Sequence, residues 1–152
     1  MLVRVLIWIA ASLFLAGCGS QSTGNIDAIN LRQITMPGGT IVQAEVLTRR
    51  EHMMSGMMFR SNLAPDRGLL FVHAKPGKFS YWMHNVKVPL DIIWMDTEHN
   101  IVEISANTPP CLEADPVRCP HFGGAEDSQF VLELAAGMAE KYGLRKGIKL
   151  SF

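Results

Sequence analysis

Short apolar runs separated by glycine and proline turns make up most of the chain from residue 29 onward. Residues 40–47 alternate between apolar and polar side chains, which is typical of a half-buried strand. Only two short stretches, residues 49–55 and 136–142, indicate helices. Because long helices do not alternate with the strands, the pattern argues against a doubly wound parallel sheet. It predicts a mostly β (α+β) fold, a small antiparallel β-barrel or sandwich of about eight strands with two short helices.

Local signals place turns and helix ends within this pattern. Residues 75–78 read Lys-Pro-Gly-Lys and predict a type II turn between strands at 69–73 and 78–83. Residues 91–95 and 101–105 predict a second hairpin. The sequence Thr-Arg-Arg-Glu at residues 48–51 matches a capping box, in which the threonine hydroxyl caps the helix and the glutamate reaches back.

The first 17 residues differ from the rest of the chain. Arg4 provides a positive charge, and an apolar run interrupted only by Ser12 follows it. This run is shorter than the roughly 20 residues of a membrane-spanning helix. Leu-Ala-Gly-Cys at residues 15–18 comes directly after it and resembles the lipobox of bacterial lipoproteins, whose cysteine is acylated and becomes the new N-terminus. We therefore expect residues 1–17 to be a signal peptide and Cys18 to be lipidated; an uncleaved anchor is the alternative.

Lipidation would hold the protein at a membrane, since each buried CH₂ group contributes about 0.8 kcal/mol. Residues 18–28 then comprise the lipidated cysteine and a small, polar, flexible linker. Residues 29–152 form a single β-rich domain. The expected location is the bacterial cell envelope, facing the periplasm. Gly19, rather than aspartate, follows the cysteine, which in the lipoprotein sorting pattern favours the outer over the inner membrane.

The charge balance excludes an electrostatic mode of attachment. The chain has 14 Lys and Arg against 14 Asp and Glu, a formal net charge of zero. A nucleic-acid-binding protein would instead carry a basic stripe, and a polybasic membrane anchor would carry a basic cluster. We therefore expect no nucleic-acid partner, and expect membrane attachment to depend on the lipid at Cys18.

Two cysteines remain after Cys18, and they flank a proline-containing stretch. Cys111 and Cys119 form an even pair, which in an oxidising compartment predicts a disulfide. A metal site formed by these cysteines and His121 is the alternative. Two cysteines eight residues apart match the C-x₂₋₄-C spacing of zinc sites poorly, so no metal site is predicted.

Five segments resemble one protein family in their order along the chain. They read Gly-Met-Met-Phe-Arg at 56–60, Gly-Leu-Leu-Phe-Val at 68–72, Tyr-Trp-Met-His-Asn at 81–85, Pro-Leu-Asp-Ile-Ile at 89–93 and Val-Leu-Glu-Leu at 131–134. This set resembles the domain of unknown function 192 family from about Thr40 to Phe152. The resemblance implies a small β-rich barrel or sandwich and no established reaction. The segment with the two cysteines is longer than the family's usual loop.

Polar residues within these apolar motifs are the candidates for a binding site. Asp91 and Glu133 stand among apolar strand residues, where a carboxylate must face solvent or find a partner. Arg60 could be that partner, because its guanidinium meets a carboxylate in two hydrogen bonds. Trp82 could form a pocket wall, and Asn85 could bind a ligand or begin a turn. We expect these five residues to form a ligand cleft, with a structural ion pair as the alternative.

The residues support three functional hypotheses. The first is a non-catalytic module that binds a small ligand or a protein partner. The second is a hydrolase that uses Asp91 or Glu133 as a base, assisted by His84 or Arg60. The third is a Cu(I) carrier, since thioethers favour this ion and four methionines cluster at Met53, Met54, Met57 and Met58. No phosphate loop, dinucleotide fingerprint or Ser-His-Asp arrangement is present, so we assign no catalytic residue and expect no cofactor.

Overall fold

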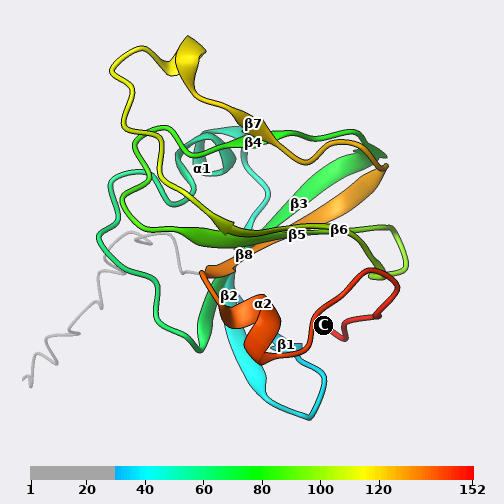
Figure 1. Ribbon diagram of the computed structural model, residues 1–152. Coiled ribbons are helices and arrows are strands. Elements are labelled where there is room, and N and C mark those ends of the chain that lie inside the picture. The colour runs from blue at the N-terminus through cyan, green and yellow to red at the C-terminus, as the bar shows by residue number, and fades with distance from the viewer. Residues whose placement is uncertain (1–29) are drawn as a thin grey trace, which may run out of the picture.

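The computed structural model describes residues 30–152 (Figure 1). The predicted signal peptide (1–17), the predicted lipidation site Cys18 and the predicted linker (18–28) lie outside the described residues. The described part is mostly β, as predicted, with two short helices.

Six strands form the main sheet in the order β1-β2-β3-β8-β5-β6. All neighbours are antiparallel except β2 and β3, which run parallel, so the sheet is mixed rather than antiparallel. The sheet does not close into a barrel, and the fold is sandwich-like. The strands are β1 (Leu31–Thr35), β2 (Ile41–Leu47), β3 (Arg67–Gly77), β5 (Leu90–Met95), β6 (Ile101–Thr108) and β8 (Ser128–Ala135).

The parallel pair arises from the long connection between β2 and β3. Parallel neighbours need a crossover, and residues 48–66 provide it, with helix α1 (Arg50–Ser55) inside it. A second, two-stranded sheet pairs β4 (Tyr81–Trp82) with β7 (His121–Phe122). In Figure 1, α1 and the β4–β7 pair lie over one face of the main sheet, whereas α2 (Met138–Lys141) and the C-terminal segment lie on the other side.

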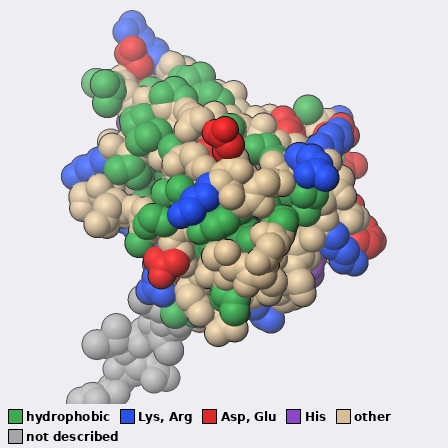
Figure 2. Space-filling model, turned by 60° about the horizontal axis from the view of Figure 1, so that its bottom comes forward, with side chains coloured by type: hydrophobic (Ala, Val, Ile, Leu, Met, Phe, Trp, Pro, Cys, Tyr) green, Lys and Arg blue, Asp and Glu red, His purple; other side chains and the backbone are tan. Residues whose placement is uncertain are grey.

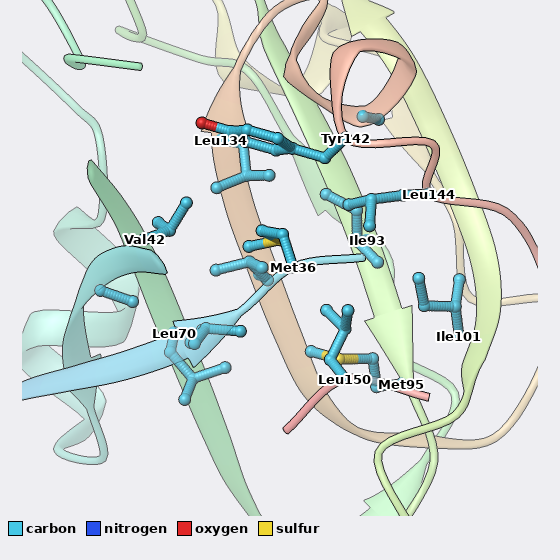
Figure 3. Close-up of a cluster of buried hydrophobic side chains, with 14 residues drawn as sticks. Met36, Val42, Leu70, Ile93, Met95, Ile101, Leu134, Tyr142, Leu144 and Leu150 are labelled. Carbon is cyan, nitrogen blue, oxygen red and sulfur yellow. The ribbon is translucent and has the colours of Figure 1, made fainter. Parts of the chain in front are cut away.

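Side chains therefore enter two hydrophobic cores, one on each face of the sheet. Ile93 and Leu132 are register partners and belong to the first core, which Figure 3 shows with Leu144 and Leu150 closing it from the C-terminal segment. Their chain neighbours Ile92 and Val131 belong to the second core, beneath α1 and the small sheet. Because both faces of the sheet are covered, every residue of β5 (Leu-Asp-Ile-Ile-Trp-Met) is buried.

Some local predictions are confirmed and others are wrong. The hairpin of β5 and β6 forms as predicted. The turn predicted at 75–78 does not form: β3 continues to Gly77, with a register irregularity after Val72, and β4 pairs with β7 instead. The capping box is also wrong, because the residue before α1 is Arg49 and no side chain caps this helix end.

The small sheet lies against Trp94, which protrudes from β5. Its indole nitrogen donates a hydrogen bond of 2.8 Å to the carbonyl oxygen of Phe79, just before β4. Gly123 follows β7 with a φ of 68°, and a Cβ atom there would clash with the Trp94 ring. Glycine at this position thus permits the close approach of β7 to the main sheet.

The disulfide between Cys111 and Cys119 is present, as predicted, with a Cα–Cα distance of 5.7 Å. Its loop contains a short 3₁₀ helix, Pro116–Arg118, whose first turn is capped by Asp115 through a 3.1 Å bond from Val117 N–H. The backbone N–H of Cys111 also donates to the carbonyl oxygen of Met83 at 3.0 Å. The loop is thereby fixed next to the β4–β7 pair.

The surface carries charges of both signs without a stripe of one sign on the face in Figure 2. This distribution agrees with the balanced composition. Within residues 30–152, no helix is long and apolar enough to cross a membrane.

Candidate functional site

Glu133 occupies the middle of the main sheet. It lies on β8 between Leu69 of β3 and Ile92 of β5, which are its register partners. Its side chain points to the second core, and only 5% of the residue is exposed. The oxygen Oε2 is buried and has no hydrogen-bond partner among the described residues. A carboxyl group in this setting is unusual, because a buried polar group without a partner costs free energy.

Glu133 lines a cavity of about 710 Å³ that opens between the sheet, α1 and the β4–β7 pair. Most of the lining is apolar. α1 and the turn after it contribute methionines, and β3, β4 and the segment between them contribute aromatic rings. Prominent among the lining residues are Met53, Met57, Phe71, Phe79, Tyr81 and Trp82. A concave, mostly apolar cavity with a few polar groups is the usual form of a small-molecule site.

The apolar surroundings change the acidity of Glu133. Burial raises the pKa of its carboxyl group to about 8, although the positive charge of Arg60 acts in the opposite direction. Below this pKa the side chain is mostly protonated, so at neutral pH it can donate a hydrogen bond. Burial, and secondarily the charge of Glu133, also raises the pKa of the Tyr81 hydroxyl.

Arg60 lies close enough to influence Glu133, but it is bound to another carboxylate. Its two terminal nitrogens donate to the two oxygens of Glu45 at 2.8 and 2.9 Å. This bidentate pair raises the pKa of Arg60, with burial opposing it. An ion pair of the predicted kind therefore exists, but its acid is Glu45 on β2 rather than Asp91 or Glu133.

Asp91 lies on the opposite face of the sheet from Glu133. Its register partner is Leu134, one residue beyond Glu133, and successive strand residues point to opposite faces. Oδ1 accepts from the N–H of Asn107 and Oδ2 from the N–H of Ala139, both at 2.7 Å. The carboxylate thus holds the start of α2 against the sheet. The structure does not bring Asp91 to the cavity.

Trp82 and Asn85 lie on the far side of the cavity from the main sheet. Trp82 lines the cavity, and its ring is 5.6 Å from that of His84 and 5.9 Å from that of His121. Asn85 is exposed and does not line it. Its φ is 58°, and its carbonyl oxygen accepts a 2.9 Å bond from Phe59 N–H, so it forms a turn that ties two loops together.

Comparison with known proteins places this architecture in a family. A model of the family DUF192, described as "Uncharacterized ACR", matches residues 33–152. The chain belongs to the DUF192 family. Comparison with curated proteins gives no match.

Two solved structures share the fold of this DUF192 domain. A protein of unknown function from Novosphingobium aromaticivorans DSM 12444 is 24% identical and superposes with a TM-score of 0.73, covering 94% of this chain and 100% of the other. A Sinorhizobium meliloti 1021 protein described as a "putative transcription regulator" is 26% identical, with a TM-score of 0.72, 84% of this chain and 97% of the other covered. Both are similar to this chain over nearly their whole length.

The four methionines of the copper hypothesis all line the cavity of the DUF192 domain, although Met57 is only 1% exposed. Among residues 30–152, no group of three or more His, Cys, Asp or Glu side chains could hold a metal ion. The thioethers form part of an apolar wall, which is the common role of methionine at adaptable binding surfaces.

Several residues of the site were not identified from the sequence. Glu45 is 15 residues from Arg60 and lies on β2, whereas Arg60 lies in the connection after α1, so no local spacing indicated the pair. His73 contacts Tyr81 at 3.1 Å through Nε2 and the hydroxyl oxygen, and its ring stacks on Phe79 with 3.5 Å between centroids. Burial lowers the pKa of His73. In the sequence, only the alternation of side chains around Tyr81 could have indicated that aromatic residues line the site, because Tyr81 begins one of the family motifs.

Proposed function

We propose that this DUF192 domain binds a small amphipathic molecule in the cavity between the main sheet, α1 and the β4–β7 pair. One observation carries the proposal: Glu133 is a buried carboxyl group with an unpartnered oxygen in the wall of a large apolar cavity. The apolar part of a ligand would pack on the methionines and aromatic rings. Its polar group would meet Glu133.

The energetics of Glu133 favour a binding role over a purely structural one. The oxygen Oε2 of Glu133 has no hydrogen-bond partner among the described residues to offset its burial, and replacing the side chain with an apolar one would remove that cost. Asp91 shows the contrast, because both of its oxygens accept backbone N–H groups and hold a helix in place. A ligand that bonds to Glu133 would offset the cost of burying it.

Of the five residues expected to form a ligand cleft, the proposal retains two as direct contacts. Glu133 and Trp82 line the cavity, whereas Arg60 acts on Glu133 by its charge. Asn85 contributes through the turn that it forms near the cavity. Asp91 has no part in binding.

A fluorescent probe tests the proposal. N-phenyl-1-naphthylamine is neutral at pH 7, and its emission rises in an apolar site. We expect saturable binding of one probe to the polypeptide 28–152. Ala74→Trp should weaken it by narrowing the cavity that the exposed Ala74 lines, whereas Ala106→Trp, at an exposed position of β6 outside the cavity, should not. Equal binding by wild type and Ala74→Trp would refute the proposed site.

Lipid attachment at Cys18 is the second part of the proposed function. The sequence Leu-Ala-Gly-Cys after an apolar run supports a protein anchored by lipid in the bacterial envelope, with its domain facing the periplasm from the outer membrane. Cells expressing the chain should incorporate labelled palmitate into the wild type but not into Cys18→Ser. Label in the Cys18→Ser protein would refute the assignment.

A hydrolytic enzyme is a second candidate, because a carboxyl group with a pKa near 8 in a concave apolar site has the properties of a general acid or base. In this version Glu133 acts alone, since Asp91 is on the other face. Screening the 28–152 polypeptide against ester, amide and glycoside substrates would reveal turnover that Glu133→Gln lacks. Equal rates in both proteins would eliminate this candidate.

The copper hypothesis keeps one supporting observation, the four thioethers around a single cavity. It requires tight Cu(I) binding that disappears when Met53, Met54, Met57 and Met58 are all replaced by leucine. Equal weak binding by the two proteins would eliminate it.

A further inference from the structure

The charges near the base of the cavity leave a negative group without a protein counterion. The positive charge of Arg60 is taken up by Glu45 in two hydrogen bonds. When Glu133 ionises, the three groups Glu45, Arg60 and Glu133 carry a net charge of −1. An incoming group that is positively charged would therefore complement this part of the cavity, whereas an anion would be repelled.

Aromatic rings surround the same space. Phe71, Phe79, Tyr81 and Trp82 all line the cavity, and the centroids of the Phe71 and Tyr81 rings are 5.1 Å apart in an edge-to-face arrangement. Ring faces attract cations, and the attraction strengthens where water is excluded. A buried carboxyl group among several aromatic side chains is thus a set of groups suited to an organic cation.

We propose that the ligand of this cavity is a protonated amine with an apolar or aromatic substituent, whose ammonium group binds Glu133 and whose substituent packs among the rings and methionines. This inference rests on the proposed binding function and specifies its ligand class. The other basic groups that line the cavity do not repel a cation at Glu133. Arg50 and His121 are exposed residues, and the pKa of His73 is lowered.

Binding by such a ligand involves the transfer of one proton. In the free protein Glu133 is mostly protonated at pH 7, because its pKa is about 8. The ammonium ion stays protonated and stabilises the carboxylate, so the proton of Glu133 leaves to solvent. About 0.9 proton should be released for each amine bound at pH 7. No covalent bond is made or broken.

The same linkage predicts how affinity depends on pH. If only ionised Glu133 binds the ammonium ion, the competent fraction rises about 50-fold from pH 6 to pH 8, and the apparent dissociation constant falls by the same factor. The titratable and charged groups around Glu133 and its cavity are Arg60, bound to Glu45, Tyr81, His73, and at the exposed positions Arg50 and His121. Burial lowers the pKa of His73 and raises that of Tyr81, so both are shifted away from the pH range in which Glu133 titrates.

Calorimetry on the full chain in phosphatidylcholine nanodiscs tests this inference, with empty nanodiscs as the blank. The ligands are benzylamine and its neutral counterpart benzyl alcohol. We expect the amine to bind at least about 10-fold more tightly than the alcohol and to release protons, measured from the dependence of the heat on buffer ionisation enthalpy. Glu133→Gln should remove both effects, whereas Glu140→Gln, at an exposed position of α2, should remove neither. Trp82→Leu should weaken the amine more than the alcohol.

The outcomes separate the inference from the proposed function. Benzyl alcohol binding as tightly as benzylamine, or amine binding without proton release, would overturn the organic-cation inference and leave the amphipathic site standing. Failure of both ligands, together with failure of the naphthylamine probe in the 28–152 polypeptide, would overturn the proposed function itself.

Discussion

Replacing Glu133 with glutamine should change how the stability of the domain depends on pH. Glutamine has the shape of a protonated glutamate and cannot ionise. In the wild type the carboxyl group has a pKa of about 8 when folded, against its ordinary value of 4.5. A raised folded-state pKa means that the folded protein holds a proton that the unfolded chain has already lost. The stability contributed by this proton is complete below pH 4.5 and is lost as the pH rises through 8.

The size of the effect follows from the two pKa values. At pH 6 the retained proton stabilises the folded state by about 2.7 kcal/mol, and at pH 9 by almost nothing. The free energy of unfolding of the wild type, relative to that of Glu133→Gln, should therefore fall by about 2.7 kcal/mol between these pH values. Contributions from the other side chains are common to the two proteins and cancel in the difference.

Urea unfolding of the 28–152 polypeptide, followed by tryptophan fluorescence at several pH values, measures this difference. Glu140→Gln is the matched control and should follow the wild type at every pH, because the residue is exposed. If the difference between wild type and Glu133→Gln does not change with pH, Glu133 is ionised in the folded state, and the reasoning from its burial is wrong.

Three further predictions concern the groups around the site. Asp91→Ala should lower the free energy of unfolding by about 3–5 kcal/mol in urea denaturation, since the buried N–H of Ala139 and the part-buried N–H of Asn107 lose their carboxylate acceptor; a loss under 1 kcal/mol would contradict the role in holding α2. Replacing Cys111 and Cys119 with serine should cost about 2.6 kcal/mol by the same assay, as expected for closing a loop of nine residues, and an unchanged stability would contradict this. Glu45→Gln should lower the pKa of Glu133 in a carboxyl ¹³C titration, because Arg60 loses its counterion; an unchanged or higher pKa would show that Arg60 does not act on Glu133.

The β-rich class and several elements could be predicted because their signals are local. The hairpin of β5 and β6 follows from apolar runs on either side of a polar turn, and the helix ending before Gly143 follows from a short amphipathic stretch. The parallel pairing of β2 with β3 could not be predicted, because it depends on how a crossover of about 20 residues folds back on the sheet. The same long-range pairing makes the sheet mixed, where an antiparallel barrel or sandwich was expected.

The site shows the same limit at the level of single residues. Asp91 and Glu133 are both acids among apolar strand residues, and the neighbouring residues do not distinguish their roles. Pairing of β5 with β8 places Asp91 opposite Leu134 and Ile92 opposite Glu133, so the two acids face opposite cores. A shift of this register by one residue would bring the two acids to the same face of the sheet. Their different roles are therefore set by a long-range contact that no local pattern contains.

The most direct test of Glu133 as a buried acid in a binding site is a carboxyl ¹³C NMR titration of this residue in the 28–152 polypeptide, recorded with and without N-phenyl-1-naphthylamine. A buried Glu133 that lines the binding site should show a titration midpoint near pH 8 in the free protein and a change in its signal when the probe binds. A midpoint near the ordinary value of 4.5, with a signal that the probe leaves unchanged, would contradict both the buried acid and its place in the binding site.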